Sequence, residues 1–450
     1  MSYFNCHSHT EYSNIRLLDC INKPEDLIDK AIEIGLSGIA ITDHECLSAH
    51  MKVNRYTKKI RETHPDFTVA LGNEIYLVEE RVSGQKYPHF LLIAKDATGH
   101  KALRELSSIA WYNSFVDRGM ERVPTTKAEL AHIVKKYRGH LIATTACMGG
   151  ELSTALANGD FEAADEFIGF CHSLFGDDFY IECAPSANSD QIQVNQELLQ
   201  VAQKHKIKLV IGTDAHYLTK EDRYVHKAYL NSKGGEREVD AFYEFSRLMD
   251  EAEARQLLLL SFHQDDIVDW IFSNSKDLQS KITYYSLERE QMIPKVQVKD
   301  YPRCSAWEWD MYPTIRELLS SDNTQERYWI NECIQKLVEM GLDGNSEYAK
   351  RLEIEADIIK YIGGKLDDCL FAYFNTFKHY IDLFWECGSI VGPGRGSATG
   401  FLSNYLLGIT QLDPIRWSLP YWRFLNKERA ELPGLLLMLG SCKKRTLTVA

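Results

Sequence analysis

Near its start the chain reads FNCHSHT at residues 4–10, a short apolar segment that ends in two histidines separated by one residue. In an extended strand the side chains of residues i and i+2 face the same side, so His7 and His9 can hold one metal ion together. Two unrelated surface histidines would give the same pattern, and the segment alone leaves that alternative open. The surrounding sequence has to decide between a metal site and a chance pair.

Strands and helices alternate through about the first 220 residues, as in proteins built on a parallel sheet. Short apolar runs that are typical of buried strands occur at residues 38–42, 68–72, 89–94, 140–145, 179–182 and 208–212, and helical patterns separate them. So many alternations predict an α/β barrel. In such barrels the loops at the carboxyl ends of the strands build the active site.

Polar residues that can ligate a metal stand at or just past these strand ends. They are His7, His9, Asp43, His44, Glu74, Cys147, Asp214 and His216. Taken singly they have simpler explanations, because a cysteine is often a small buried hydrophobe and an aspartate can stabilise a turn. Their coincidence at strand ends indicates a metal site, in which Asp43 is interpreted as a residue that orients a neighbouring ligand. The histidines on helical stretches are expected to be solvated: His50, His100, His132, His172 and His205.

The composition is that of a globular protein, with 44% hydrophobic and 26% charged residues. A chain of 450 residues exceeds one ordinary core, which predicts two or three domains. The absence of long apolar runs and of a signal peptide, together with eleven scattered cysteines, predicts a cytoplasmic protein without a membrane partner. Its net charge of −13 means that a nucleic-acid partner would need local positive charge, such as bound divalent metals.

From Met1 to about Lys220 the chain resembles the polymerase-and-histidinol-phosphatase (PHP) domain, in the version found at the N-terminus of bacterial DNA polymerase III alpha subunits. The motifs that carry this resemblance are HSHTEYS at 7–13, LLD at 17–19, ITDH at 41–44, GNE at 72–74, His89, ACMGGE at 146–151 and TDAHY at 213–217. The family's nine metal ligands then correspond to His7, His9, Asp19, His44, Glu74, His89, Cys147, Asp214 and His216. The resemblance implies an α/β fold, a distorted (βα)7-type barrel.

The resemblance also implies up to three divalent metal ions, zinc and/or manganese, because histidines and a thiolate suit zinc while carboxylates tolerate manganese. Such a cluster clamps the oxygens of a phosphate ester and lowers the pKa of a bound water. Three carboxylates and an ionised Cys147 would bring about four negative charges against about six from three ions, leaving positive charge for a phosphate. Family members with a complete ligand set act as 3′–5′ exonucleases, so the nine residues are expected to act in catalysis on a DNA 3′ end.

A mostly helical second module is expected to follow. The predicted domains are a PHP domain at residues 1–235, a connecting region at 236–310 and a partial palm-like domain at 311–450. Within the last, VGPGRGSATG at residues 391–400 is a glycine-rich turn whose backbone N–H groups can cradle phosphate. The resemblance to the alpha-subunit palm, carried further by LGIT at 407–410 and RFLNKER at 423–429, places four residues near the triphosphate of an incoming nucleotide: Gly394, Arg395, Gly396 and Ser397.

The sequence departs from the family just beyond Pro433. Where the palm has magnesium-binding aspartates, residues 434–439 read GLLLML and offer no ligating side chain. We therefore expect no polymerisation by this chain alone, magnesium only if a complete palm is supplied elsewhere, and a split, truncated or frame-slipped polymerase as the origin. The expected partners are a DNA 3′ end and, for an assembled polymerase, a second polymerase polypeptide, a sliding clamp or other replisome proteins.

Two other functions remain open. One is a phosphomonoesterase of the histidinol-phosphatase type, against which the palm-like module argues. The other is a non-catalytic docking module of a split polymerase, in which metals would only stabilise the fold.

Overall fold

Most strands of the first part of the chain follow one another in sequence order around one sheet. A computed structural model describes residues 3–15, 18–232, 243–290, 292–304 and 309–429. The path through the sheet runs through β1 (Phe4–Asn5), β2 (Gly38–Ile41), β3 (Thr68–Val78), β4 (His89–Ala94), β8 (Leu141–Thr144), β9 (Phe179–Cys183) and β10 (Leu209–Ile211). A short strand, β7 (Thr125–Thr126), pairs with the far end of β3, and β5 (Phe115–Asp117) and β6 (Met120–Arg122) form a separate hairpin.

The last strand of this path returns to the first. Ser8, just after β1, forms a parallel bridge with Ala215, just after β10, and the backbone N–H of Cys6 donates to the carbonyl of Ile211 over 3.3 Å. The sheet is therefore a nearly closed barrel, which confirms the predicted α/β barrel. Apolar residues from consecutive strands fill its interior, among them Phe4, Ala40, Leu91 and Ile142.

One strand runs against the predicted direction. β4 is antiparallel to both β3 and β8, whereas the other pairs along the path are parallel. The connection between β3 and β4, residues 79–88, is shorter than the dozen or so residues that a parallel crossover requires. The chain therefore turns back as a hairpin, and the first residue of β4, His89, lies at the edge where the parallel strands end.

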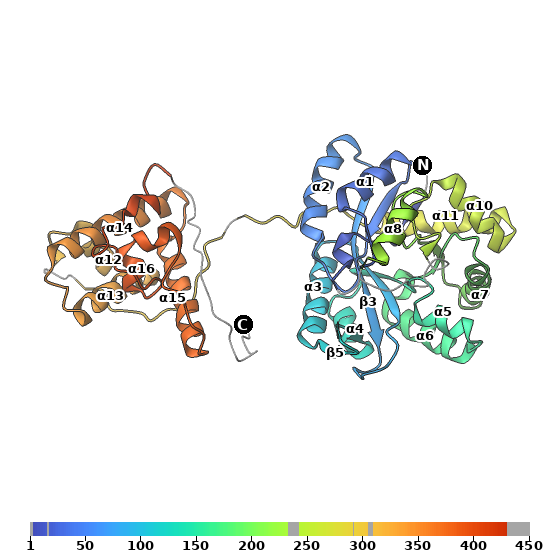
Figure 1. Cartoon of the computed structure of the whole chain (residues 1–450), viewed down its shortest axis with the longest axis horizontal. Coiled ribbons are helices and arrows are strands. Elements are labelled where there is room, and N and C mark those ends of the chain that lie inside the picture. Colours follow the sequence, from blue (N-terminus) through green and yellow to red (C-terminus); the bar gives the residue numbers. More distant parts are fainter. Residues whose placement is uncertain (1–2, 16–17, 233–242, 291, 305–308, 430–450) are drawn as a thin grey trace. The chain divides into compact units, whose positions relative to one another are not determined.

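Helices cover the outside of the barrel (Figure 1). They are α1 (Pro24–Glu33), α2 (His50–Thr63), α3 (Ala97–Tyr112), α4 (Lys127–Lys136), α5 (Glu151–Ala157), α6 (Phe161–Phe175), α7 (Ser189–His205), α8 (Asp222–Leu230), α10 (Glu251–Phe262) and α11 (Asp265–Ser280). Proline in the first turn of α1 and Asn188 as the N-cap of α7 show how the sequence starts these helices. Among the described residues, no helix has both the length and the apolar character needed to cross a bilayer.

The chain divides into two compact units, Met1–Arg289 and Glu290–Ala450. This division differs from the predicted boundary, because α10 and α11 belong to the first unit and not to a connecting region. Val268, Ile271 and Phe272 of α11 are buried in the barrel's main hydrophobic core. Asp265, Asp266 and Asp269 of α11 are exposed.

The second unit is mostly helical, as predicted. It contains α12 (Pro313–Ser320), α13 (Thr324–Glu339), α14 (Ser346–Lys365), α15 (Phe371–Glu386) and α16 (Leu402–Leu406), with short 3-10 segments at Gly396–Gly400 and Tyr421–Arg423. Its core gathers large aromatic residues, and Trp329 packs edge-to-face on Phe371 with ring centroids 4.9 Å apart. The stretch 434–439, where the sequence lacks palm aspartates, lies outside the described residues.

Candidate metal centre

All nine residues predicted as metal ligands come together at one edge of the barrel. His7 and His9 follow β1, His44 follows β2, His89 begins β4, Cys147 lies beyond β8, and Asp214 and His216 lie beyond β10. Asp19 comes from the loop before α1. Leu17, in the same loop, lies outside the described residues. Glu74 was expected just past the end of its strand, but it lies within β3, which continues to Val78. A parallel bridge between Glu74 and His44 places it at the same edge of the barrel.

The potential ligand atoms form three overlapping groups. In each, the atoms lie within 4.8 Å of one another, and the groups are His7, His9 and Asp214; His44, Glu74 and His89; and His9, His44 and His216. Asp19 joins at one side, with Oδ2 3.0 Å from Nε2 of His44 and 3.2 Å from Nε2 of His216. Cys147 joins at the other, with Sγ 3.5 Å from Nδ1 of His89.

Hydrogen bonds made on the outer side of the rings fix which nitrogen of three histidines faces the centre. Nδ1 of His7 lies 2.7 Å from Oε1 of Glu182, and Nδ1 of His216 lies 2.7 Å from the carbonyl oxygen of Asp214. Nδ1 of His9 lies 2.9 Å from Oγ of Ser13, which itself donates to Asp43 over 2.8 Å. Each of these Nδ1 atoms is therefore a donor, and each Nε2 presents its lone pair to the centre.

These lone pairs face other lone pairs. Nε2 of His7 and Nε2 of His9 lie 3.0 Å apart, and Oδ1 of Asp214 lies 3.2 and 3.1 Å from them. Both carboxylate oxygens of Glu74 and Oδ1 of Asp214 are buried and receive no hydrogen bond from any described residue. Such an arrangement is costly unless a cation stands between the atoms, and nitrogen and oxygen ligands in this number suit a divalent metal. The residues present therefore fit a metal cluster.

The electrostatics of the centre favour positive charge. Burial by itself raises the pKa of Glu74, but His89, His44 and His7 outweigh it and hold that pKa well below its usual range. Burial lowers the pKa of His7, yet the carboxylates of Glu182, Asp214 and Glu74 raise it well above its usual value. A proton bound there would have to leave when a metal binds.

The thiol of Cys147 behaves differently. Burial, followed by the charges of Asp214 and Glu74, raises its pKa well above the usual value. The ionised Cys147 expected from the sequence therefore depends on a cation close to Sγ.

Several residues that support the ligands were not among the predicted site residues. Glu182, the fourth residue of β9, is 3% exposed and also accepts from Oγ1 of Thr144 over 2.6 Å. Tyr243 donates to Oδ1 of Asp19 over 2.5 Å, and His226 donates to the Asp19 carbonyl over 2.6 Å. A buried acidic residue in an apolar strand was the available signal for Glu182, whereas no sequence pattern connects residues 226 and 243 with Asp19.

Asp43 has the kind of role that the sequence suggested, but for another ligand. Its carboxylate accepts from the backbone N–H of Thr10 over 2.6 Å and from Ser13, and it acts on His9 through Ser13. Two histidines that were expected to be solvated are buried instead. Nδ1 of His50 lies 3.0 Å from Nε2 of His100, and Nε2 of His50 donates to the carbonyl of Gly72.

Glu182 gives a first testable prediction. A carboxylate behind a ligating histidine typically contributes 10–100-fold to metal affinity or activity. We expect Glu182→Gln, which keeps the side-chain shape but removes the charge behind His7, to weaken zinc or manganese binding by about 10–100-fold. Competition with a chelating dye measures this affinity. Glu62→Gln removes an equal charge from an exposed position on α2 and should leave it unchanged; equal affinities in both variants would contradict the role of Glu182.

The glycine-rich turn of the second unit lies apart from this centre in the sequence and is described by itself. Gly394 and Gly396 adopt positive φ angles of 119° and 73°, while the side chains of Arg395 and Ser397 are exposed. The first N–H groups of α16 are already used, because the buried carboxylate of Glu355 accepts from the backbone N–H groups of Leu402 and Ser403 over 2.7 and 2.8 Å. A phosphate at this turn would therefore have to be held by residues 394–397 and not by the start of α16.

Comparisons with known proteins bear on both units. The family described as "PHP domain" matches residues 5–186, and the family described as "Bacterial DNA polymerase III alpha NTPase domain" matches residues 319–437. The first match ends before Asp214 and His216, whose placement at the centre comes from the barrel itself.

Relatives match almost the whole chain. "Probable DNA polymerase YorL" of Bacillus subtilis is 37% identical over 99% of this chain and 37% of its own length, and the "DNA polymerase III subunit alpha" of Aquifex aeolicus is 28% identical over 96% of this chain and 36% of its own length. A solved structure from Bifidobacterium adolescentis, described as a candidate metal-dependent phosphoesterase, overlaps 57% of this chain and 96% of its own with a TM-score of 0.32 and 18% identity.

The chain spans little more than a third of the length of these curated relatives. Within that span the order of parts agrees with the structure, since a PHP barrel is followed by a helical unit that matches the NTPase domain of the alpha subunit. The chain therefore belongs to the family of bacterial DNA polymerase III alpha subunits, with a PHP domain followed by the NTPase domain of that family.

Proposed function

We propose that the cluster of nine residues binds divalent metal ions and hydrolyses DNA phosphodiester bonds from the 3′ end, as a 3′–5′ exonuclease. The observation that carries the proposal is the convergence of Nε2 lone pairs with buried carboxylate oxygens that no described residue satisfies. A phosphoesterase centre needs such a set, because it must hold several cations and still leave positive charge for the phosphate.

The chain's own residues would hold and orient the ions. His7, His9 and Asp214 would share one, His44, Glu74 and His89 a second, and His9, His44 and His216 would reach toward a third, with Asp19 and Cys147 at the two sides. Zinc or manganese bound there would supply Lewis-acid activation of water and neutralise charge on the scissile phosphate.

The supporting residues have distinct tasks in this proposal. Glu182 keeps the proton of His7 on Nδ1, and Asp43 does the same for His9 through Ser13. Tyr243 holds Oδ1 of Asp19, which leaves Oδ2 pointing toward His44 and His216. These contacts fix the ligand atoms before a metal arrives, and this reduces the cost of assembling the site.

For the whole protein of which such a chain forms part, we propose DNA as the substrate and other replication proteins as partners, by analogy with the relatives named as DNA polymerases. Gly394, Arg395, Gly396 and Ser397 would contribute phosphate contacts to nucleotide addition only together with a magnesium-binding palm. The metal centre is proposed to act independently of that activity.

The test uses the full chain loaded with manganese or zinc and single-stranded DNA labelled next to its 3′ end. We expect stepwise release of nucleotides that stops on chelation. Asp19→Ala and His216→Ala should each lower the rate by more than about 100-fold, because each removes a ligand and not a residue behind one. Asp66→Ala, at an exposed position, is the matched control and should keep the parent rate.

The same assay separates the alternatives. Untouched 3′ ends, or degradation by Asp19→Ala and His216→Ala as fast as by the parent, would overturn the exonuclease. Faster turnover of small phosphomonoesters than of DNA would favour the phosphatase, and metal binding that raises the melting temperature without any hydrolysis would favour a structural role.

A further inference from the structure

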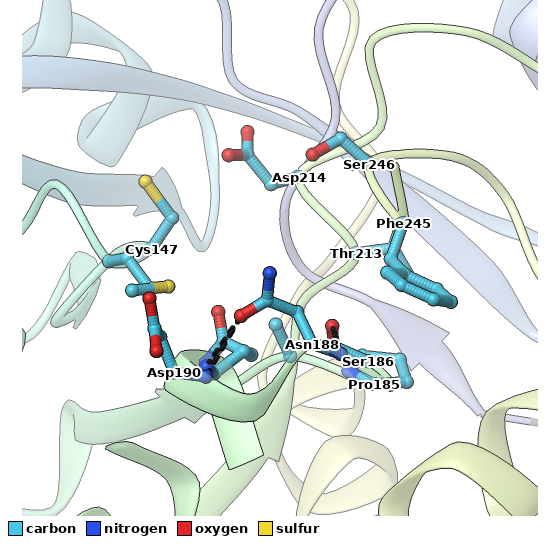
Figure 2. Close-up of a pocket in the computed structure, with 12 residues that line it drawn as sticks. Cys147, Pro185, Ser186, Asn188, Asp190, Thr213, Asp214, Phe245 and Ser246 are labelled. Atoms are coloured by element: carbon cyan, nitrogen blue, oxygen red, sulfur yellow. Dashed lines mark hydrogen bonds between the residues drawn. The ribbon is translucent and has the colours of Figure 1, made fainter. Parts of the chain in front are cut away.

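A cavity of about 270 Å³ opens beside the metal centre. Cys147 and Asp214 of the cluster form part of its wall, as Figure 2 shows. The other lining residues are Met148, Ala184, Pro185, Ser186, Asn188, Asp190, Gln191, Thr213, Phe245 and Ser246. Binding pockets for small molecules commonly enclose roughly 300–1,000 Å³, so this cavity admits one group of about the size of a nucleoside and is too small for a base pair.

The charge of the lining excludes a phosphate as the group that fills the cavity. None of the lining residues is a lysine, arginine or histidine, and two of them, Asp190 and Asp214, are carboxylates. An ion of the cluster would offset the charge of Asp214, but an anion placed away from the cluster would face Asp190 without any cationic side chain in the wall. A neutral group is therefore favoured there, while the adjoining cluster provides the place for a phosphate.

Asn188 presents a hydrogen-bond donor whose orientation is fixed by the fold. Its Oδ1 accepts from the backbone N–H groups of Asp190 and Gln191 over 2.9 and 3.4 Å, as the N-cap of α7. The amide cannot turn over without breaking this cap, so Nδ2 must face the cavity, and Figure 2 shows it directed toward the side where Asp214 lies.

Thr213 also contributes to the wall of this cavity. Oγ1 of Thr213 is buried, in a residue only 2% exposed, and has no hydrogen-bond partner among the described residues. Because this oxygen is inaccessible even to a water molecule, it does not face the cavity, and the amide of Asn188 provides the hydrogen-bonding point there. Met148, Pro185 and Phe245 contribute apolar surface to the same wall.

We propose that this cavity binds the unpaired terminal nucleoside of a DNA 3′ end, with its base against Phe245 and Met148 and an acceptor on the base edge hydrogen-bonded to Asn188. The assignment rests on the proposed exonuclease, since it places the scissile phosphate at the neighbouring cluster. It adds that the enzyme takes a strand end that has left its partner, because a base pair does not fit. Base contacts of this kind, which combine stacking with one donor, tolerate any of the four bases.

The test measures thymidine binding to the full chain by isothermal titration calorimetry, because a neutral nucleoside probes the cavity without its phosphate. Asn188→Ser and Asn188→Asp both keep a good N-cap for α7 but remove the amide donor. We expect each to weaken thymidine binding about tenfold, as the loss of one hydrogen bond to a buried partner predicts. Ser189→Ala, on the same turn and outside the lining, should bind like the parent.

A second measurement separates this assignment from the exonuclease. On single-stranded 3′ ends, Asn188→Ser should raise KM about tenfold while the bound metal content stays that of the parent.

Undiminished thymidine binding and an unchanged KM in both Asn188 variants would overturn the cavity assignment while leaving the exonuclease intact. If the chain binds thymidine through Asn188 but degrades no DNA, the cavity is a nucleoside site and the proposed exonuclease activity is wrong. Binding of deoxyribose as tight as that of thymidine would overturn the proposed contacts to the base.

Discussion

Glu74→Gln is expected to abolish hydrolysis at the metal centre, with a rate loss of more than about 100-fold, because neutralising a ligand costs more than removing a partner behind one. Oε1 of Glu74 lies 2.9 Å from Nδ1 of His89, and Oε2 lies 2.8 Å from Nδ1 of His44 and 3.3 Å from Nε2 of His9. One buried carboxylate thus faces ligands that belong to all three groups. The amide of glutamine brings no negative charge, and its NH₂ group cannot ligate a cation.

The measurement combines the release of labelled nucleotides with the metal content of the purified protein, determined by mass spectrometry. Glu79→Gln is the matched control. Glu79 is the first residue after the same strand, but its side chain is 75% exposed and pairs with Lys127. The variant at Glu74 should lose both activity and bound metal, whereas the control should lose neither. A Glu74→Gln protein with full metal content and parent activity would show that Glu74 is not a metal ligand.

Trp329→Ala should destabilise the second unit by about 3–5 kcal/mol, the usual cost of truncating a large buried aromatic residue. Trp329 is fully buried in α13 and packs on Phe371. For a unit of this size the loss corresponds to a fall of roughly 6–20 °C in melting temperature. Calorimetry of the full chain should show two transitions, with only one of them moved, because the two units have separate hydrophobic cores.

Trp329→Phe is the control for this substitution. It keeps an aromatic ring against Phe371 and removes an indole N–H that has no acceptor among the described residues, so the loss should stay below about 1.5 kcal/mol. A shift of both transitions together in Trp329→Ala would contradict two independently unfolding units.

The sequence was informative about the barrel because its signals are local. The pattern of an apolar strand followed by a polar ligand is recognisable in the sequence at residues 38–44 and 208–216, whatever packs against these strands. The direction of β4 was not readable in this way, since a six-residue strand looks the same in either orientation. Only the short connection at residues 79–88 contained the information that it must turn back.

The domain boundary shows the same limit. Helix α11 has Val268, Ile271 and Phe272 on one face, but whether that face meets solvent, a linker or the barrel depends on tertiary packing. The sequence between the two modules contains no informative motif, so it indicated only a connecting region at residues 236–310. Similarly, His50 and His100 were expected in solvent because a helical pattern does not say which histidine will be buried.

For the metal centre, the sequence by itself indicated ligating residue types just past several strands, at His7, His9, His44, Cys147, Asp214 and His216, because strand ends and ligand chemistry are local properties. The tertiary structure alone decided how these atoms face one another: Glu182 behind His7, Tyr243 on Asp19, and Nε2 of His7 and His9 3.0 Å apart. It also decided that a nucleoside-sized cavity adjoins Cys147 and Asp214, since its wall combines residues 147 to 246. Contacts between residues so far apart in the chain follow from barrel closure, which no segment of the sequence specifies alone.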